Sequence, residues 1–224
     1  GTPTTHRHRS PRRPPGGRAH RRQNVPASLH TCVVSTETAQ LFSGLLTVAA
    51  GLLGISVVVL RVATAVGDER ARQVGAAVTD AGVWLAFLIA SGSMLGSLYF
   101  SEVADFVPCR LCWFQRIAMY PLVPILLVGA IRRDPNVRWY AGPIALVGAG
   151  IAGYHTLIEW RPALDTGACE LTGPSCTFVW FREFGFISLA TMALTAFLTI
   201  LILLFVRFPA RLDTAPQVEM ESAS

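Results

Sequence analysis

Long apolar segments separated by short polar links make up most of the chain from residue 41 onward. A helix needs about 20 mainly apolar residues to cross the hydrocarbon layer of a membrane. Five candidate segments can be distinguished: Leu41–Val62, Val83–Phe100, Trp113–Ile131, Trp139–Ile158 and Phe186–Val206. The last four fit this length best. The pattern therefore predicts an all-α membrane protein, a four-transmembrane-helix bundle with one extra N-terminal apolar segment.

The composition agrees with a membrane protein. Only 15% of the residues are charged, whereas soluble domains carry about 25%. The net charge of +5 comes from arginine alone, because the chain has no lysine, and seven of the arginines precede residue 23. This charge does not indicate nucleic-acid binding. We expect contact with membrane lipid and no nucleic acid.

The composition also changes along the chain and predicts four regions. The first is rich in Arg, Pro, Gly, Ser and Thr and has almost no apolar clusters, which is typical of disorder. The predicted regions are a disordered basic tail (1–40), the extra apolar segment with a polar link (41–82), the four-helix bundle (83–206) and a cytoplasmic tail (207–224).

Arginine placement orients the four-helix unit. The link 132–138 carries three arginines, and two more follow the last apolar segment. Because cytoplasmic loops are enriched in Lys and Arg, the links 101–112 and 159–185 should face the outside. Four of the five cysteines lie in these two outer links, where disulfides persist. In this orientation the segment 41–62 would start outside, with the basic tail, unless it is re-entrant or interfacial.

The four outer cysteines form two pairs. Cys109 and Cys112 have C-x-x-C spacing, which can close a small reactive disulfide. Cys169 and Cys176 are separated by a loop with a Gly-Pro turn signal, so they can also pair. Two pairs on one face predict a two-step thiol–disulfide relay. Two other interpretations stay open: a four-cysteine zinc site, or two inert structural disulfides.

Two polar residues inside the apolar segments are candidates for binding a cofactor, together with Cys112. Arg116 lies one helical turn after Cys112. Its charge can stabilise a thiolate or the oxygen of a reduced quinone, unless the side chain only snorkels to the interface. His155 lies near the outer end of the fourth segment. It can donate a hydrogen bond or a proton to a bound quinone, or simply bond a neighbouring carbonyl.

Together these features resemble the DsbB-type family of quinone-linked disulfide oxidoreductases. The resemblance covers about residues 83–206 and includes the order of the four apolar segments. The matching motifs are P-C-R-L-C-W-F-Q-R (108–116), H-T-L-I-E (155–159), the later cysteine pair and F-G-F-I (184–187). The vitamin K epoxide reductase family is similar, but its loop cysteines precede the C-x-x-C pair, whereas here they follow it.

The resemblance implies an enzyme, a quinone-dependent protein-disulfide oxidoreductase of the bacterial cell (inner) membrane. A four-helix bundle would hold a quinone, menaquinone or ubiquinone, near the outer membrane surface. The partner would be a DsbA-like thiol oxidase with a thioredoxin fold, whose mixed disulfide forms with Cys169. Cys176 would then exchange with Cys109, and Cys112 would pass electrons to the quinone while Arg116 favours its thiolate. No metal is expected, and the direction of electron flow depends on the reduction potentials.

Overall fold

The computed structural model describes residues 35–165 and 174–208, and within these ranges the chain is helical apart from short connections. The elements are α1 (Thr36–Ala65), α2 (Glu69–Glu102), α3 (Arg110–Arg132), α4 (Val137–Trp160), a short 3₁₀ turn η2 (Pro162–Leu164) and α5 (Leu189–Phe205). Extended pairing among the described residues is limited to one isolated bridge between Glu183 and Ile187. The predicted all-α class is confirmed.

Helices α1 to α4 extend beyond the apolar segments that predict them, whereas α5 is shorter than its segment Phe186–Val206. α2 begins at Glu69 rather than Val83, so most of the expected polar link forms its first turns. Asp68 starts this helix by accepting hydrogen bonds from the backbone N–H groups of Arg70 and Ala71. Helices α1 to α4 are long and apolar enough to cross a membrane, and α5 is a shorter apolar helix of 17 residues. This agrees with a multi-pass membrane protein.

The start of α3 is capped by a cysteine. The sulfur of Cys109 accepts a hydrogen bond from the backbone N–H of Cys112 at 3.3 Å. The first N–H groups of a helix have no partner inside the helix, so a capping side chain stabilises its start. The first cysteine of the C-x-x-C pair is therefore held in place by the helix that begins beside it.

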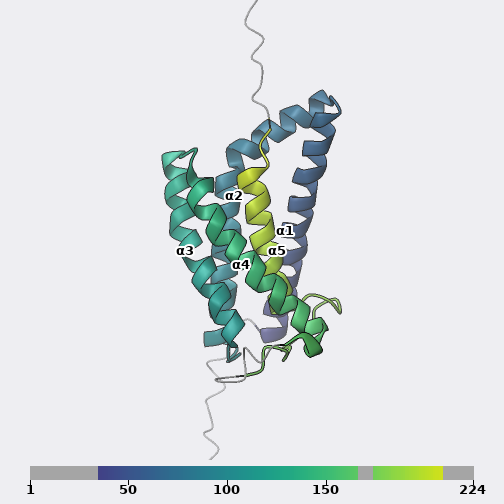
Figure 1. Cartoon of the computed structure of the whole chain (residues 1–224), viewed down its shortest axis with the longest axis vertical. Helices are drawn as coiled ribbons and strands as arrows, with labels where there is room; N and C mark the ends of the chain where they lie inside the picture. Colours follow the sequence, from purple (N-terminus) through teal and green to yellow (C-terminus); the bar gives the residue numbers. More distant parts are fainter. Residues whose placement is uncertain (1–34, 166–173, 209–224) are drawn as a thin grey trace, which may run out of the picture. The chain divides into compact units, whose positions relative to one another are not determined.

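Seven pairs of neighbouring helices build the bundle, and the smallest contact is between α3 and α5. α2 packs against α3 and α5, α4 packs against α3 and α5, and α1 packs against α2 and α5; Figure 1 shows their arrangement. The start of α3, the end of α4 and the start of α5 lie at one end, called here the cysteine end. The opposite end, where α1 joins α2 and α3 joins α4, carries seven arginines: Arg61, Arg70, Arg72, Arg132, Arg133, Arg138 and Arg207.

Small residues allow the helices to approach each other closely. Gly148 of α4 faces Phe197 of α5, whose side chain is completely buried. A Cβ atom at Gly148 would come within 2.3 Å of the Phe197 ring. Small residues at such positions are typical of helix interfaces in membranes, where close van der Waals packing stabilises association. Contact between α4 and α5 therefore requires glycine at this position.

Substitution of Gly148 by alanine is expected to destabilise the bundle by about 1–3 kcal/mol, because the added methyl group overpacks the interface with Phe197. Gly150→Ala is the matched control, since it changes the same helix where a Cβ would meet nothing within 4 Å. Thermal unfolding in detergent gives the melting temperature of each variant. Equal melting temperatures for the two variants would contradict the close approach of α4 and α5.

Candidate active site

The C-x-x-C pair is present as two free thiols at the start of α3. The sulfur atoms of Cys109 and Cys112 lie 2.9 Å apart. Cys109 is only 5% exposed, while Cys112 is partly buried. The two sulfurs are close enough to share a proton in this reduced form. Oxidation to a disulfide would need only a small further approach.

His155 of α4 lies against the thiol pair. Its Nε2 is 3.1 Å from the backbone oxygen of Cys176 and 3.8 Å from the sulfur of Cys109. A carbonyl oxygen can only accept, so Nε2 carries the proton in this geometry. Nδ1 then accepts a hydrogen bond from the side-chain amide of Gln115, at 3.0 Å. His155 therefore presents an N–H group to the Cys109 sulfur.

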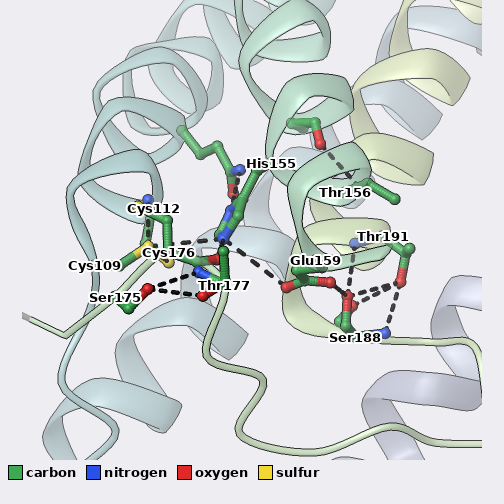
Figure 2. A network of polar contacts seen from close by, with 12 residues as sticks. Cys109, Cys112, His155, Thr156, Glu159, Ser175, Cys176, Thr177, Ser188 and Thr191 are labelled. Carbon is green, nitrogen blue, oxygen red and sulfur yellow. Dashed lines mark hydrogen bonds and ion pairs between the residues drawn. The ribbon is translucent and has the colours of Figure 1, made fainter. Parts of the chain in front are cut away.

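Polar contacts continue from His155 to the start of α5, as Figure 2 shows. One carboxylate oxygen of Glu159 lies 3.8 Å from His155 Nε2, and the other accepts a hydrogen bond from the hydroxyl of Ser188. Ser188 also caps α5 in a reciprocal pair with Thr191. A buried carboxylate needs such partners. The network thus couples the orientation of His155 to the packing of α4 on α5.

The second cysteine pair is described in part. Cys176 is completely buried, packs in one cluster with Cys109, Leu111 and Ile158, and takes part in a disulfide. Cys169, its predicted partner, lies outside the described residues. The structure therefore places the second loop cysteine beside the first cysteine of the C-x-x-C pair.

A cavity of about 430 Å³ opens on the other side of the thiol pair, between α1, α2, α3 and α5. This volume is within the range of small-molecule sites. Its walls are mainly apolar, and the polar side chains contributed by α3 are Cys112, Gln115, Arg116 and Tyr120. Cys109 and His155 do not line it. Cys112 is therefore the cysteine that belongs both to the thiol pair and to the cavity.

Arg116 is fixed at the cavity wall. Its guanidinium donates a hydrogen bond to the backbone oxygen of Ser97 at 2.9 Å and lies over the ring of Trp113, 5.3 Å from the centroid. Among the described residues its partners are neutral, so the guanidinium keeps donors and a positive charge beside the cavity. A quinone has a flat ring with carbonyl acceptors and an apolar tail. A cationic donor in the wall of a mainly apolar cavity fits such a molecule.

Two polar residues of this region were missed by the sequence analysis. Gln115 contacts His155 and also lines the cavity. Tyr120 lines the cavity, and its buried hydroxyl has no hydrogen-bond partner among the described residues. The spacing held a signal for Tyr120, because it follows Cys112 and Arg116 at successive intervals of four residues. Such residues lie on one face of a helix.

The pKa of Cys109 is lowered to about 4. The largest cause is the hydrogen bond from the Cys112 thiol, and the contact with His155 adds to it, while burial acts in the opposite direction. Cys109 precedes the first residue of α3 and so lies outside the membrane-spanning segments. The reduced pair therefore offers a thiolate, the reactive form of cysteine, at neutral pH.

Alkylation of Cys109 in the reduced protein is expected to persist to low pH. A lowered pKa keeps the thiolate present above about pH 4, and reactivity is lost as the pH falls through that value. Cys112→Ala removes the hydrogen bond that the Cys112 thiol donates to Cys109, so the midpoint should move to higher pH. Mass spectrometry of alkylated peptides measures both midpoints. A wild-type midpoint near the ordinary thiol value of about 8.5 would contradict this environment.

The thiol pair and the imidazole also form a potential metal site. One ligand atom each from Cys109, Cys112 and His155 lies within 4.8 Å of the others. Structural zinc sites take four protein ligands, and this cluster has three members within residues 35–165 and 174–208. Cys176 is engaged in a disulfide and does not offer a thiolate.

A buried dithiol beside a cavity in an all-helical membrane bundle defines a membrane thiol–disulfide oxidoreductase. The family model of the disulfide bond formation protein DsbB matches residues 79–207, which is more than half of the chain. The chain therefore belongs to the DsbB family of disulfide bond formation proteins. Membership implies oxidoreductase activity together with a thiol–disulfide partner.

Individual relatives agree with this family. The chain is 44% identical over 119 residues to the disulfide bond formation protein C of Bacillus subtilis (strain 168), covering 53% of this chain and 84% of the relative. It is 43% identical over 122 residues to a probable disulfide formation protein C 2 of Bacillus cereus, covering 54% and 87%. A probable disulfide formation protein of Metapseudomonas resinovorans is 41% identical over 123 residues, covering 54% and 85%. No solved structure matches the chain.

Proposed function

We propose that this protein reoxidises an extracytoplasmic, DsbA-like thioredoxin-fold partner and passes the electrons to a membrane quinone. The observation that supports this most directly is the position of Cys112. Its sulfur lies 2.9 Å from that of Cys109, and its side chain also lines the cavity. One atom thus connects a site for thiol–disulfide exchange with a site for an apolar electron acceptor.

The loop pair receives the electrons first. A thiolate of the partner attacks Cys169 in the Cys169–Cys176 disulfide, which gives a mixed disulfide and releases Cys176. Cys176 then attacks Cys109 of the oxidised C-x-x-C pair, the bond between Cys109 and Cys112 breaks, and Cys112 leaves as a thiolate. Burial of Cys176 in one cluster with Cys109 supports this exchange. A second partner thiolate resolves the mixed disulfide, so the partner leaves oxidised and Cys169 is released as a thiolate. Cys169 then attacks Cys176 in the Cys176–Cys109 bond, which forms the loop disulfide again and leaves Cys109 and Cys112 as a reduced pair.

The surrounding residues stabilise the charges that this exchange creates. The Nε2–H group of His155 faces the sulfur of Cys109, and Glu159 and Gln115 hold the imidazole in that orientation. Arg116 provides a positive charge on the cavity side, one turn after Cys112. His155 thus contacts Cys109 of the thiol pair, and its hydrogen bond with Gln115 links it to a residue that lines the cavity. A direct contact of His155 with the quinone stays a prediction.

A bound quinone would supply an acceptor for two electrons and two protons. Cys112, Gln115 and Arg116 would hold the ring end, and the apolar walls would hold the tail. The thiol pair loses two electrons and two protons as the bond between Cys109 and Cys112 forms again. Both menaquinone and ubiquinone fit this description.

The cysteine end would face the outside of the cell. The opposite end carries the described arginines of the two connecting links, and such residues are enriched on the cytoplasmic side. The cysteine loops would then be extracytoplasmic, in the inner membrane of a bacterium.

Turnover of the purified protein tests this function. A reduced thioredoxin-fold dithiol protein is mixed with the full chain in detergent, and quinone absorbance is followed with menaquinone and ubiquinone analogues in turn. Reduction of at least one quinone that requires both the partner and the protein is expected. Oxidation of neither the partner nor any quinone analogue would overturn the proposal.

A metal site is the second candidate, favoured by the convergence of Cys109, Cys112 and His155. Bound zinc would occupy both thiolates that the relay requires, so the two functions exclude each other at this site. Metal analysis of the reduced protein separates them, with the Cys109→Ser/Cys112→Ser double variant as control. One zinc per chain in the wild type and none in the variant would favour the metal site.

A further inference from the structure

Helix α1 lies outside the part of the chain that matches the family. The family model begins at residue 79, within α2, whereas α1 ends at Ala65. The matched relatives are already covered over 84–87% of their length by about 120 residues of this chain. Little of those relatives remains to correspond to a further helix of 30 residues. α1 is therefore an addition to the family core.

This added helix is firmly attached to the core. The hydroxyl of Thr199 in α5 donates a hydrogen bond to the backbone oxygen of Ala50 at 3.1 Å. Gly54 faces the same threonine so closely that a Cβ atom would lie 3.3 Å from its hydroxyl oxygen. At the cysteine end, Gly44 approaches the side chain of Glu183 in the same way. Contacts at two places, with Thr199 of α5 and with Glu183 of the segment before α5, fix the position of α1.

One face of α1 forms a wall of the cavity beside the thiol pair. The α1 residues that line it are Ser43, Leu46, Thr47, Ala49, Ala50 and Leu53. α1 does not pack against α3 among the described residues, so the cavity separates the two helices. Cys112 and Arg116 line the opposite wall. Without α1, this side of the cavity would be open to the surrounding lipid.

We propose that α1 is an added wall that holds the apolar tail of the quinone; this inference rests on the proposed function. The residues on its cavity face are apolar or carry only a hydroxyl, and Thr47 donates its hydroxyl to the backbone oxygen of Ser43. These residues can make dispersion contacts with an apolar tail, but they carry no charge that could bind a ring carbonyl. The charged donor at the cavity is on α3, at Arg116. α3 therefore binds the ring, and α1 binds the tail.

An independent observation concerns Tyr120, whose buried hydroxyl lacks a hydrogen-bond partner among the described residues. Leaving a buried hydroxyl unpaired costs about 1–3 kcal/mol. Tyr120 follows Arg116 by one helical turn, and both side chains line the same cavity. We infer that Tyr120 donates a hydrogen bond to a carbonyl of the quinone ring.

Binding measurements with two quinones separate the two roles. Trp180 lines the cavity, so quenching of tryptophan fluorescence reports occupancy without turnover. The probes are a menaquinone with a long isoprenoid tail and menadione, which has the same ring and no tail. Ala50→Phe fills the tail region and should lower the affinity for long-tailed menaquinone by at least about tenfold, which corresponds to about 1.4 kcal/mol. Menadione should bind this variant as it binds the wild type.

Leu52→Phe is the control for α1, because Leu52 is 59% exposed and lies outside the cavity lining. It should bind both quinones like the wild type. Equal affinities of Ala50→Phe and Leu52→Phe for the long-tailed quinone would overturn the role of α1. If Ala50→Phe fails to fold by thermal melting, Leu46→Ala, which removes part of the wall, should show the same selective loss. Failure of the wild type to bind either quinone would instead overturn the proposed function.

Tyr120→Phe should give a different pattern. Loss of one neutral hydrogen bond should lower the affinity for both quinones by about fivefold. The melting temperature should stay unchanged. Tyr154→Phe is the matched control, since its hydroxyl donates to the backbone oxygen of Leu164 and it does not line the cavity. Unchanged affinity of Tyr120→Phe for menadione would overturn the hydrogen bond to the ring.

Discussion

Replacing Cys112 by serine is expected to reduce quinone-dependent oxidation of a dithiol partner to background. A serine hydroxyl cannot form the disulfide with Cys109, so electrons that reach Cys109 have no path into the cavity. The measurement is quinone absorbance during turnover with a reduced partner, combined with non-reducing electrophoresis of the protein. Loss of the sulfur shared by the thiol pair and the cavity should lower turnover more than substitution of any other residue that lines the cavity.

Cys32→Ser is the control for this variant, because it makes the same chemical change at the cysteine outside both pairs. It should turn over like the wild type. Turnover by Cys112→Ser above about a tenth of the wild-type rate would mean that electrons bypass the C-x-x-C pair.

Arg116→Gln should lower kcat/KM for the quinone by about 10- to 100-fold. The substitution removes a charged donor at the cavity, and hydrogen bonds to charged groups contribute about 1.5–3 kcal/mol. Steady-state kinetics at varied quinone concentration provide the measurement, with the partner kept saturating. A rise in KM indicates loss of quinone binding, whereas a fall in kcat indicates loss of thiolate stabilisation.

Arg110→Gln is the matched control in the first turn of the same helix. Its guanidinium lies over the ring of Phe114 and does not line the cavity. Its kcat/KM should stay within about twofold of the wild-type value, because exposed charges contribute little. Equal losses in both variants would indicate a general effect of charge at the cysteine end.

The helical class and the order of the helices were predictable because apolar segments of membrane length leave few alternatives. The helix boundaries were not. α2 begins at Glu69 although its apolar segment begins near Val83, since backbone hydrogen bonds continue through polar turns once Asp68 caps the start. α3 is continuous through Pro121 and Pro124.

The site was predictable as a set of residues but not as a geometry. Spacing alone placed Arg116 one turn after Cys112, and both line the cavity. The neighbours of His155 depend on how α4 is rotated against α3 and on where the loop brings Cys176. Sequence analysis left a neighbouring carbonyl or a quinone open as the partner of His155. In the structure its Nε2 contacts the backbone oxygen of Cys176 and the sulfur of Cys109, which are tertiary neighbours, and contact with a quinone stays a prediction.

The position of the first apolar segment could not be derived from charge placement. The basic tail before the segment favoured a start on the cytoplasmic side, whereas the orientation of the four-helix unit required a start outside. A re-entrant or interfacial segment was a further possibility. The structure shows one continuous helix, long enough to cross a membrane and attached through Gly44, Ala50 and Gly54. Small residues on one face predict close packing, but the partner helix is visible only in three dimensions.

A single-turnover experiment without the partner tests the central claim most directly. The Cys169→Ser/Cys176→Ser variant isolates the C-x-x-C pair, which is reduced, freed of reductant and mixed anaerobically with one equivalent of quinone. Mass spectrometry then counts the thiols while absorbance follows the quinone. We expect one quinone to be reduced for each bond formed between Cys109 and Cys112. Quinone that quenches the fluorescence of the protein, yet stays oxidised while both thiols remain free, would contradict the account.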